Sequence, residues 1–431
     1  MLRHPRLVLL GLLFTGPLLA AGNGNGGFEF SAPPEARLAL TPNLWFGSDL
    51  VTSLEYSNNL DLDHEKPDHL TLLEPELRAV FAYQSSPNWR LYSEFQADGR
   101  HFFSQGDDNG DTSEGHLRVR QAYVQFPQIA ENLSLTVGRQ RFKDPRSWWY
   151  DERIDALRLI WQKDEFDFEV AAGRSKAFPE DHAHAGTSDS NDYYILRAGY
   201  LPKKKSEYNA YLIARRDNES DKRENPVFLG VQAVGRISSD LRYWANLAGL
   251  GGSAKGRKLR GFGADLGIVW RADLPWEPFI GLGAAFGSGD ARRDDGVDRN
   301  FRQTDLQDNE SRVFGRTSYN IYGEVADLEL SNLYIYSLVL GLQPSDDSSI
   351  ELALLRYRQV EAADELFDTD LEEDPNGRDA DIGREIDLIA AYRPNKRVKF
   401  SLLIGAFFPG KAYGSDDDTA WLAKLKFSVR F

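Results

Sequence analysis

Apolar and polar residues alternate along most of the chain, in short segments that are separated by turns. The final segment, Trp421–Phe431, is apolar at every odd position, whereas its even positions include Lys424, Lys426 and Arg430. A period of two places successive side chains on opposite faces of a β-strand, so one face would meet lipid and the other water. A strand of a soluble β-sandwich alternates in the same way. The terminal aromatic residue is typical of outer-membrane barrels and favours the membrane interpretation.

Similar segments recur along the chain, and we count about eighteen, an even number such as bacterial outer-membrane barrels have. At roughly 9–11 residues, each is long enough for a tilted strand to cross a bilayer. The pattern predicts an all-β fold, a single transmembrane antiparallel β-barrel of about eighteen strands. The strands are expected to begin near Asp49, His69, Trp89, His116, Leu133, Asp155, Phe166, Asp192, Glu207, Pro226, Leu241, Leu259, Pro278, Ser331, Ser348, Glu385, Val398 and Trp421.

The connections between these segments alternate in length. Short turns on one side and long loops on the other are typical of periplasmic turns and extracellular loops, and a soluble all-β protein has no reason to sort them so. Trp89, Trp161 and Trp270 fall at short-turn ends, where an interfacial aromatic belt would lie. The short turns are Ser85–Asn88, Lys163–Glu165, Pro202–Ser206, Ser238–Asp240, Pro344–Ser348 and Arg393–Arg397, and the longer loops are Gln105–Gly115, Lys176–Asn191, Arg215–Asn225, Asp290–Leu330 and Gln359–Arg384.

The composition agrees with a barrel and excludes several other classes of protein. The mean hydropathy is −0.48, and beyond the N-terminus no apolar run reaches the roughly 18 residues that a membrane-spanning helix needs. An alternating barrel strand averages to mild polarity and does not show such a run. The chain has no cysteine, so an exported form would depend on closed hydrogen bonding instead of disulfides. A net charge of −15 argues against a general nucleic-acid binder.

The N-terminus has the features of a secretory signal peptide. Arg3 and Arg6 precede the apolar segment Leu7–Leu19, and the small residues Ala20 and Ala21 follow it. A membrane anchor is the alternative, but the segment is short for a span. We therefore expect a signal peptide over residues 1–21, a lead-in segment over 22–48 and the barrel over 49–431, in contact with the lipid of a bacterial outer membrane.

Charges that face the lumen would determine the function of such a barrel. A lumen of this width can hold an aqueous channel, and charged rings in it select ions. The alternation slips around Arg118 and Arg120, because Leu117 and Val119 are apolar on one parity and Ala122 begins an apolar set on the other. A β-bulge near Arg120 would turn these arginines inward.

The next segment has the same conflict. Arg139 and Arg141 share the parity of the apolar residues Leu135 and Val137, and a charge that faces lipid near the midplane would cost about 2–4 kcal/mol. We expect a second bulge near Gly138 that directs both arginines into the lumen. The alternative is that both arginines lie beyond the hydrocarbon, in the headgroup zone.

Five short runs follow one another along the mature chain in an order and spacing that resemble the alginate-export porin family of outer-membrane proteins. The resemblance implies an eighteen-stranded barrel with a basic, arginine-lined constriction for an anionic polyuronate. It further implies that Arg120, Arg141 and Asp151 occupy constriction positions. The runs are Gly138–Arg141, Trp148–Ile154, Tyr322–Leu333, Gly383–Leu388 and Pro409–Gly414.

The chain also departs from the family pattern. Gln121 stands where the pattern has a glutamate, and Ser401 and Leu403 stand where it has two inward arginines. The long periplasmic turn that plugs the bore in the family is reduced here to Arg393–Arg397. Fewer arginines and a missing plug weaken the case for alginate itself and for tight gating, but leave a channel in place.

The main hypothesis is a passive export channel for an anionic polysaccharide. Arg118, Arg120, Arg139 and Arg141 with Asp151 would form its constriction, and Lys424, Lys426 and Arg430 would add positive charge to the wall. The first alternative is a general diffusion porin for small anions or sugars, which the missing plug favours. We expect no cofactor and no nucleic-acid partner, and an exporter would work with periplasmic export partners.

Two hypotheses lie outside transport. An outer-membrane enzyme would need a positioned nucleophile or base, and the sequence shows no such motif, so we expect no catalytic residues. An adhesin or receptor would act through the long acidic loops. Those loops contain the cluster Asp107–Asp111 and the segment Glu361–Asp381. Their carboxylate oxygens are of the kind that binds Ca²⁺, but a solvated acidic loop explains them better. His182 and His184 are likewise better read as loop residues than as metal ligands.

Overall fold

The alternating segments form strands whose side chains point by turns to the outside and to the inside of one barrel. The structure is a computed structural model that describes residues 34–63, 68–105, 112–175, 177, 191–202, 206–218, 223–414 and 417–431. The expected signal peptide lies outside these residues, as do His182, His184 and the acidic cluster Asp107–Asp111. Among the described residues no helix is long and apolar enough to cross a membrane.

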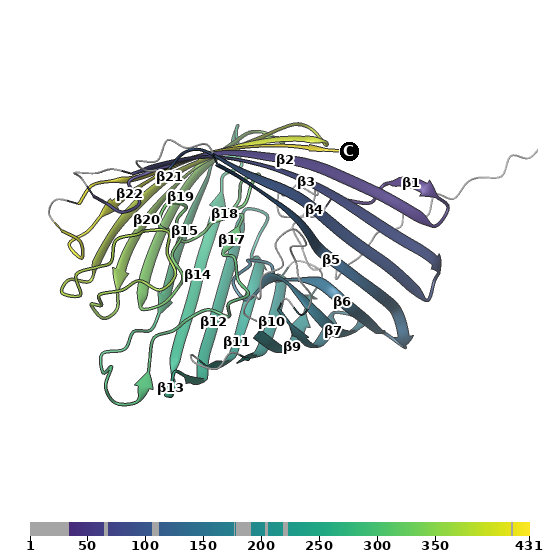
Figure 1. Cartoon of the computed structure of the whole chain (residues 1–431), viewed down its shortest axis with the longest axis horizontal. Coiled ribbons are helices and arrows are strands. Elements are labelled where there is room, and N and C mark those ends of the chain that lie inside the picture. Colours follow the sequence, from purple (N-terminus) through teal and green to yellow (C-terminus); the bar gives the residue numbers. More distant parts are fainter. Residues whose placement is uncertain are drawn as a thin grey trace, which may run out of the picture.

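Eighteen antiparallel strands close into the barrel wall, as the sequence predicted (Figure 1). The wall strands are β2 (Leu44–Asn58), β3 (His69–Ser86), β4 (Trp89–Gln105), β5 (Thr112–Ala130), β6 (Leu133–Lys143), β7 (Asp151–Lys163), β8 (Phe166–Arg174), β9 (Asn191–Tyr200), β10 (Ser206–Asp217), β11 (Glu224–Arg236), β12 (Leu241–Ala254), β14 (Gly261–Arg271), β15 (Phe279–Gly287), β19 (Leu333–Ser345), β20 (Ser348–Gln359), β21 (Asp381–Asn395), β22 (Val398–Pro409) and β23 (Ala420–Arg430). Short additions are β1 (Leu38–Thr41), β13 (Arg257–Leu259), β16 (Val297–Asp298), β17 (Glu310–Ser311) and β18 (Tyr319–Asn320).

The first and last wall strands pair with each other and leave no open edge. β2 pairs with β23 from Asp49 opposite Arg430 to Asn58 opposite Trp421. The N–H of Phe431 donates to the carbonyl of Ser48 at 2.8 Å, and Figure 1 shows the C-terminus beside β2. Closure satisfies the backbone hydrogen bonds that an edge would leave open to lipid. β2 begins at Leu44, ahead of the expected start near Asp49, and β1 pairs with it within the expected lead-in segment.

Apolar side chains cover the outside of the barrel, and polar ones line the inside. Leu157, Phe168 and Leu229 are 58%, 48% and 65% exposed on the outer face. Glu94 and Asn246 are fully buried on the inner face. A protein in water would hide those large apolar groups, whereas hydrocarbon solvates them.

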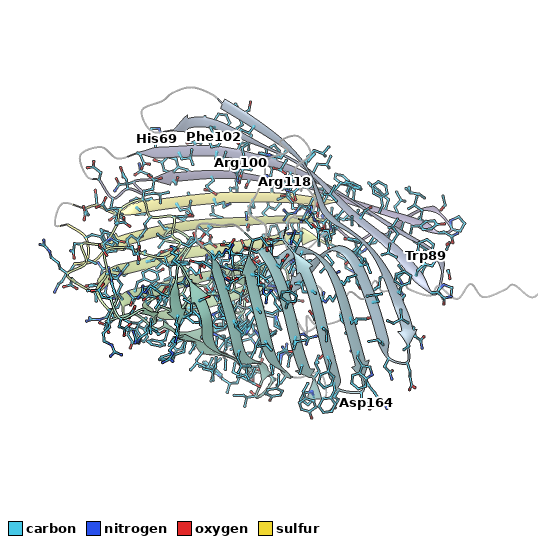
Figure 2. All side chains as sticks on the ribbon, turned by 60° about the horizontal axis from the view of Figure 1, so that its bottom comes forward. His69, Trp89, Arg100, Phe102, Arg118 and Asp164 are labelled. Carbon is cyan, nitrogen blue, oxygen red and sulfur yellow. The ribbon has the colours of Figure 1, made fainter. Side chains whose placement is uncertain are left out.

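The short turns lie together at one end of the barrel. Two-residue turns join β3 to β4, β5 to β6 and β7 to β8, and Figure 2 shows Trp89 and Asp164 at this end, opposite His69 and Phe102. Trp161 pairs with Leu133, and Trp270 pairs with Leu241, both at the same end. The predicted sorting of connections and the position of the tryptophans are therefore confirmed. We call this the short-turn end.

A long loop between β15 and β19 folds into the lumen, and we call residues 288–332 the lumen loop. It enters from the long-loop end and reaches the short-turn end, where the ring of Phe314 lies 5.0 Å from that of Phe279 at the start of β15. It then returns, and the N–H of Val325 donates to the Glu385 carboxylate at 2.7 Å. The turn between β21 and β22 is short, as expected, but the lumen loop fills much of the bore.

Candidate functional site

A cavity of about 550 Å³ lies inside the barrel. One wall is the inner face of β23 and β2–β5, and the opposite wall is the lumen loop. Of the sequence-predicted residues, it brings together Arg118, Arg120, Arg141, Asp151, Lys424 and Lys426.

Arg120 occupies a β-bulge, as the slip in the alternation suggested. Phe95 of β4 pairs with Val119, and the preceding residue Glu94 pairs with Gln121, so Arg120 has no partner position in the ladder. The extra residue lets both Arg118 and Arg120 reach the cavity, although they are followed by an apolar set of opposite parity. Arg118 lies 3.5 Å from the carboxylate of Asp98.

Arg141 reaches the cavity by a different route from the one expected. β6 pairs with β7 without a shift up to Lys143 opposite Asp151, so no bulge in that ladder reverses its parity. Instead, the pairing between β5 and β6 ends where Ala122 pairs with Arg139, and beyond this pair, toward the long-loop end, the two strands separate. Toward the long-loop end, β5 continues to pair with β4 but no longer with β6.

Gly138 marks the point where the two strands separate. Its φ is +121°, and a Cβ there would lie 2.3 Å from the carbonyl oxygen of Ala122. Above it, the N–H of Arg141 donates to Oε1 of the inward-facing Gln121 at 3.1 Å. The top of β6 and β7 therefore leans into the barrel, and its nominal outer face, which carries Arg141 and Asp151, looks into the cavity.

The connection between β6 and β7, residues 144–150, anchors this leaning hairpin. The Asp144 carboxylate accepts hydrogen bonds from the backbone N–H groups of Arg146, Trp149 and Tyr150 at 2.7–3.0 Å. The ring of Trp149 stacks on Tyr211 with 4.7 Å between centroids. Much of the family-like run Trp148–Ile154 thus fills the lumen beside β8–β12 and serves the structure.

Asp151 joins two basic side chains at the edge of the cavity. Its carboxylate is 2.5 Å from both Arg141 Nε and Lys143 Nζ, and it accepts a hydrogen bond from the Ser147 hydroxyl at 3.0 Å. On the opposite side, Lys424 lies 2.6 Å from the Glu55 carboxylate. Basic and acidic groups thus alternate around the cavity.

Two predicted residues do not line this cavity. Arg139 is nearly buried, with a bidentate contact to Asp155 at 2.8–3.0 Å and a hydrogen bond to the Val119 carbonyl at 3.0 Å. Arg430 lies 3.4 Å from Asp49, which is also held by Arg78 at 2.8 Å. Both arginines join neighbouring strands: Arg139 of β6 contacts β7 and β5, and Arg430 of β23 contacts β2.

The sequence analysis missed further residues of the cavity. Arg78 and Glu76 lie on the inward parity of β3, so alternation alone could have identified them. Arg153 lines the cavity only because the hairpin leans inward. The acidic wall of the lumen loop had no periodic signal, and it consists of Asp308, Glu310, Glu324 and Asp327, with Asp370 from the β20–β21 loop.

Burial and mutual repulsion raise the pKa values of these loop carboxyls. The pKa of Glu324 is raised to about 7 by burial and by the nearby Glu310. The pKa of Asp327 is raised to about 7 by its position inside the barrel and by Asp370 and Asp368. Burial and Asp151 also raise the pKa of Asp308. Near neutral pH the acidic wall is therefore only partly charged, while arginines keep their full charge.

One of the two positions where the family pattern has an arginine, Leu403, lies in a closed part of the lumen. Leu403 of β22 is 8% exposed and packs in the apolar core that includes Val325 of the lumen loop. Gln121 keeps a polar role, because its Nε2 donates to Glu94 at 2.5 Å while its Oε1 receives the Arg141 N–H. The cavity consequently lies on the side of β2–β5 and β23.

Comparisons with known proteins agree with this architecture. A sequence model of the family described as "Alginate export" matches residues 43–421. The alginate production protein AlgE of Pseudomonas aeruginosa is 24% identical over 459 residues, which cover 90% of this chain and 92% of that protein. AlgE of Azotobacter vinelandii is 22% identical, covering 93% of this chain and 96% of that protein.

Solved structures share the fold at low sequence identity. OccAB2 of Acinetobacter baumannii superposes with a TM-score of 0.59 at 10% identity, covering 90% of this chain and 98% of that one. OccK7 (OpdD) of Pseudomonas aeruginosa superposes with a TM-score of 0.58 at 12% identity, covering 91% and 99%. At these identities the likeness concerns the barrel alone.

Proposed function

Because the chain belongs to the alginate export family, we propose that it exports an anionic polyuronate through the cavity between β2–β5 and the lumen loop. The chain is an outer-membrane β-barrel and a channel, not an enzyme. The nature of the transported polymer and the role of the arginines are the parts that we propose.

One observation carries the proposal: two basic groups of the cavity, Arg118 and Lys424, stand in ion pairs that remain partly open to its water. Arg118 is 27% exposed beside Asp98, and Lys424 is 24% exposed beside Glu55. Hydrated pairs of this kind are worth about 0–1 kcal/mol each. A uronate carboxylate can therefore replace the protein carboxylate and leave again, which conduction requires of each binding position.

The groups that are ionised near pH 7 determine the net charge of the cavity. Arg120, Arg141 and Arg153 lie together on the β5–β7 side, while the carboxyls opposite are partly protonated near pH 7. Inside low-dielectric walls, charges near the path dominate over the exposed acidic loops, which salt screens within about 8–10 Å. We therefore expect the pore to prefer anions despite a net charge of −15.

Planar-bilayer recordings test this proposal. Arg120→Gln with Arg141→Gln should lower the ratio of anion to cation permeability, and Lys163→Gln with Lys396→Gln is a control that removes the same charge from exposed short turns. Both variants should insert like the wild type. A cation-selective wild type, or an equal response of the two variants, would contradict a basic path.

A diffusion porin for small anions or sugars is the second candidate, because a cavity of about 550 Å³ also suits a small solute. The two candidates differ in their response to chain length. An exporter should be blocked for longer by a decameric uronate than by a monomer, since each added carboxylate finds a further basic group. Equal block by both lengths would favour the porin.

A further inference from the structure

A second group of arginines lies at the short-turn end of the lumen, apart from the cavity described above. We propose that this group binds carboxylates of the anionic polymer at the periplasmic mouth, before the polymer enters the cavity. The central members are Arg242 of β12, Arg316 of the lumen loop and Arg393 of β21, with Arg236 and Arg312 beside them, and we call them the mouth cluster. The proposal rests on the proposed function for the identity of the ligand.

Two of these arginines, Arg312 and Arg316, lie on the lumen loop, which is anchored to the wall beside them. Its segment 312–316 has Phe314 at the centre, and the Arg242 guanidinium lies 4.0 Å from the centre of that ring. The Phe314 carbonyl accepts a hydrogen bond from Gln343 Nε2 at 3.0 Å, and the Arg316 N–H donates to Ser349 Oγ at 2.8 Å. Residues of β12, β19 and β20 thus fix the tip of the loop at the short-turn end.

Next to the tip, buried Lys399 of β22 donates from Nζ to Thr317 Oγ1 at 3.1 Å. Gly315 lies against the buried Glu351 carboxylate, where a Cβ would come within 1.6 Å of Oε1. These contacts leave the tip little freedom. A fixed tip means that the arginines on either side of Phe314 are held in place before any ligand arrives, which reduces the entropy lost on binding.

The cluster gathers like charges. Arg242 lies within electrostatic reach of Arg236, Arg271, Arg312 and Arg316. Arg393 lies within reach of Arg312 and Arg316, with Asp347 as an opposite charge. Such groups repel one another, and an anion placed among them would relieve the repulsion.

The nearby carboxylates do not balance this charge. Asp240 and Glu277 contact Arg271, at 3.4 and 3.0 Å. Glu351 is a single buried carboxylate that faces Arg312. The Nε atoms of Arg242, Arg316 and Arg393 are buried and find no hydrogen-bond acceptor within the described part of the chain. A carboxylate from outside would instead contact the Nη atoms of these arginines, since guanidinium groups bind carboxylates in a bidentate manner.

The apolar core above the cluster separates it from the open cavity. Tyr319, Ile321, Val339 and Leu355 belong to one packed cluster of buried side chains. This apolar core blocks a direct route for the polymer from Arg242 toward the long-loop end. A bound segment of the polymer would instead stay at the periplasmic mouth, where it raises the local concentration of polymer chain ends near the cavity.

Binding of trigalacturonate to the purified, folded full chain in detergent tests the proposal by calorimetry. Arg242→Gln with Arg316→Gln should weaken binding at least tenfold, because the variant loses charge-assisted hydrogen bonds to the carboxylates of the ligand. The matched control, Lys396→Gln with Arg397→Gln, removes two exposed charges from a turn at the same end. It should keep the wild-type affinity, and neutral maltotriose should not bind.

Equal weakening by both variants would show a general effect of charge at the mouth and would overturn the site. Absence of trigalacturonate binding to the wild type would overturn it as well. Heat-modifiable migration in gels serves as the folding check, and if the first variant fails it, Arg316→Gln alone replaces it, since Arg316 lies in the loop. The selectivity test of Arg120 and Arg141 is independent of the mouth, so the failure of one proposal is distinguishable from the failure of the other.

Discussion

Gly138 decides at the scale of one residue how the arginines of β6 reach the lumen. The sequence analysis expected a bulge here because Arg139 and Arg141 had the parity of lipid-facing residues. The parity is retained, and the strand leaves the wall instead. Apolar–polar alternation thus signals that a conflict exists. It does not specify whether an extra residue or a departure of the strand resolves it, because both satisfy the same requirement that charge avoid lipid.

Gly138→Ala should destabilise the barrel by about 1–3 kcal/mol, because a left-handed φ is strained for alanine and its Cβ would meet the Ala122 carbonyl. The temperature at which the folded band disappears in gel electrophoresis should fall. Gly115→Ala is the matched control in the neighbouring strand, since its Cβ would meet nothing within 4 Å. Equal melting of both variants would argue against a special role for Gly138.

At the scale of elements, strands could be predicted and the lumen loop could not. Each wall strand has one face in lipid and one in the lumen, so its pattern is periodic and its start could be placed from sequence to within five residues. The lumen loop packs against the wall on several sides. Its buried residues, such as Phe301, Tyr319 and Val325, follow no period, and only its length marked it as unusual.

The lumen loop should limit conductance, because it crosses the bore from the long-loop end to the short-turn end and occupies much of it. Replacing residues 305–328 by a short Gly-Ser linker should increase single-channel conductance several-fold in planar bilayers. Deleting the exposed residues 292–295 of the same loop should leave conductance unchanged. An unchanged conductance after the larger replacement would mean that the loop does not obstruct the path.

The terminal strand closes the barrel, and its last residue contributes to that closure. Removing Phe431 should reduce the amount of assembled protein in outer membranes, because its N–H bonds to Ser48 and its aromatic side chain ends the outer apolar face. Quantitative blots of the heat-modifiable form would measure this. Wild-type levels of the truncated chain would show that β23 pairs with β2 without help from its last residue.

At the scale of the whole molecule, the two walls of the cavity respond differently to pH. The arginines stay charged throughout, whereas Glu324 and Asp327, with pKa values raised to about 7, are neutral below that pH and anionic above it. Deprotonation adds negative charge opposite Arg120 and Arg141. The preference for anions should therefore be strong at about pH 5 and should fall as pH rises through 7–8.

Reversal potentials measured at a series of pH values test this prediction, and Glu324→Gln with Asp327→Asn is the decisive variant. It removes two cavity carboxyls whose pKa values are raised to about 7 and leaves the basic wall intact, so its selectivity should stay anionic to higher pH and change less between pH 6 and 9 than that of the wild type. Asp308, whose pKa is also raised, remains in the variant. If the wild type and the variant lost anion preference in parallel, titration elsewhere would control the pore, and the lumen loop would act on it by shape alone.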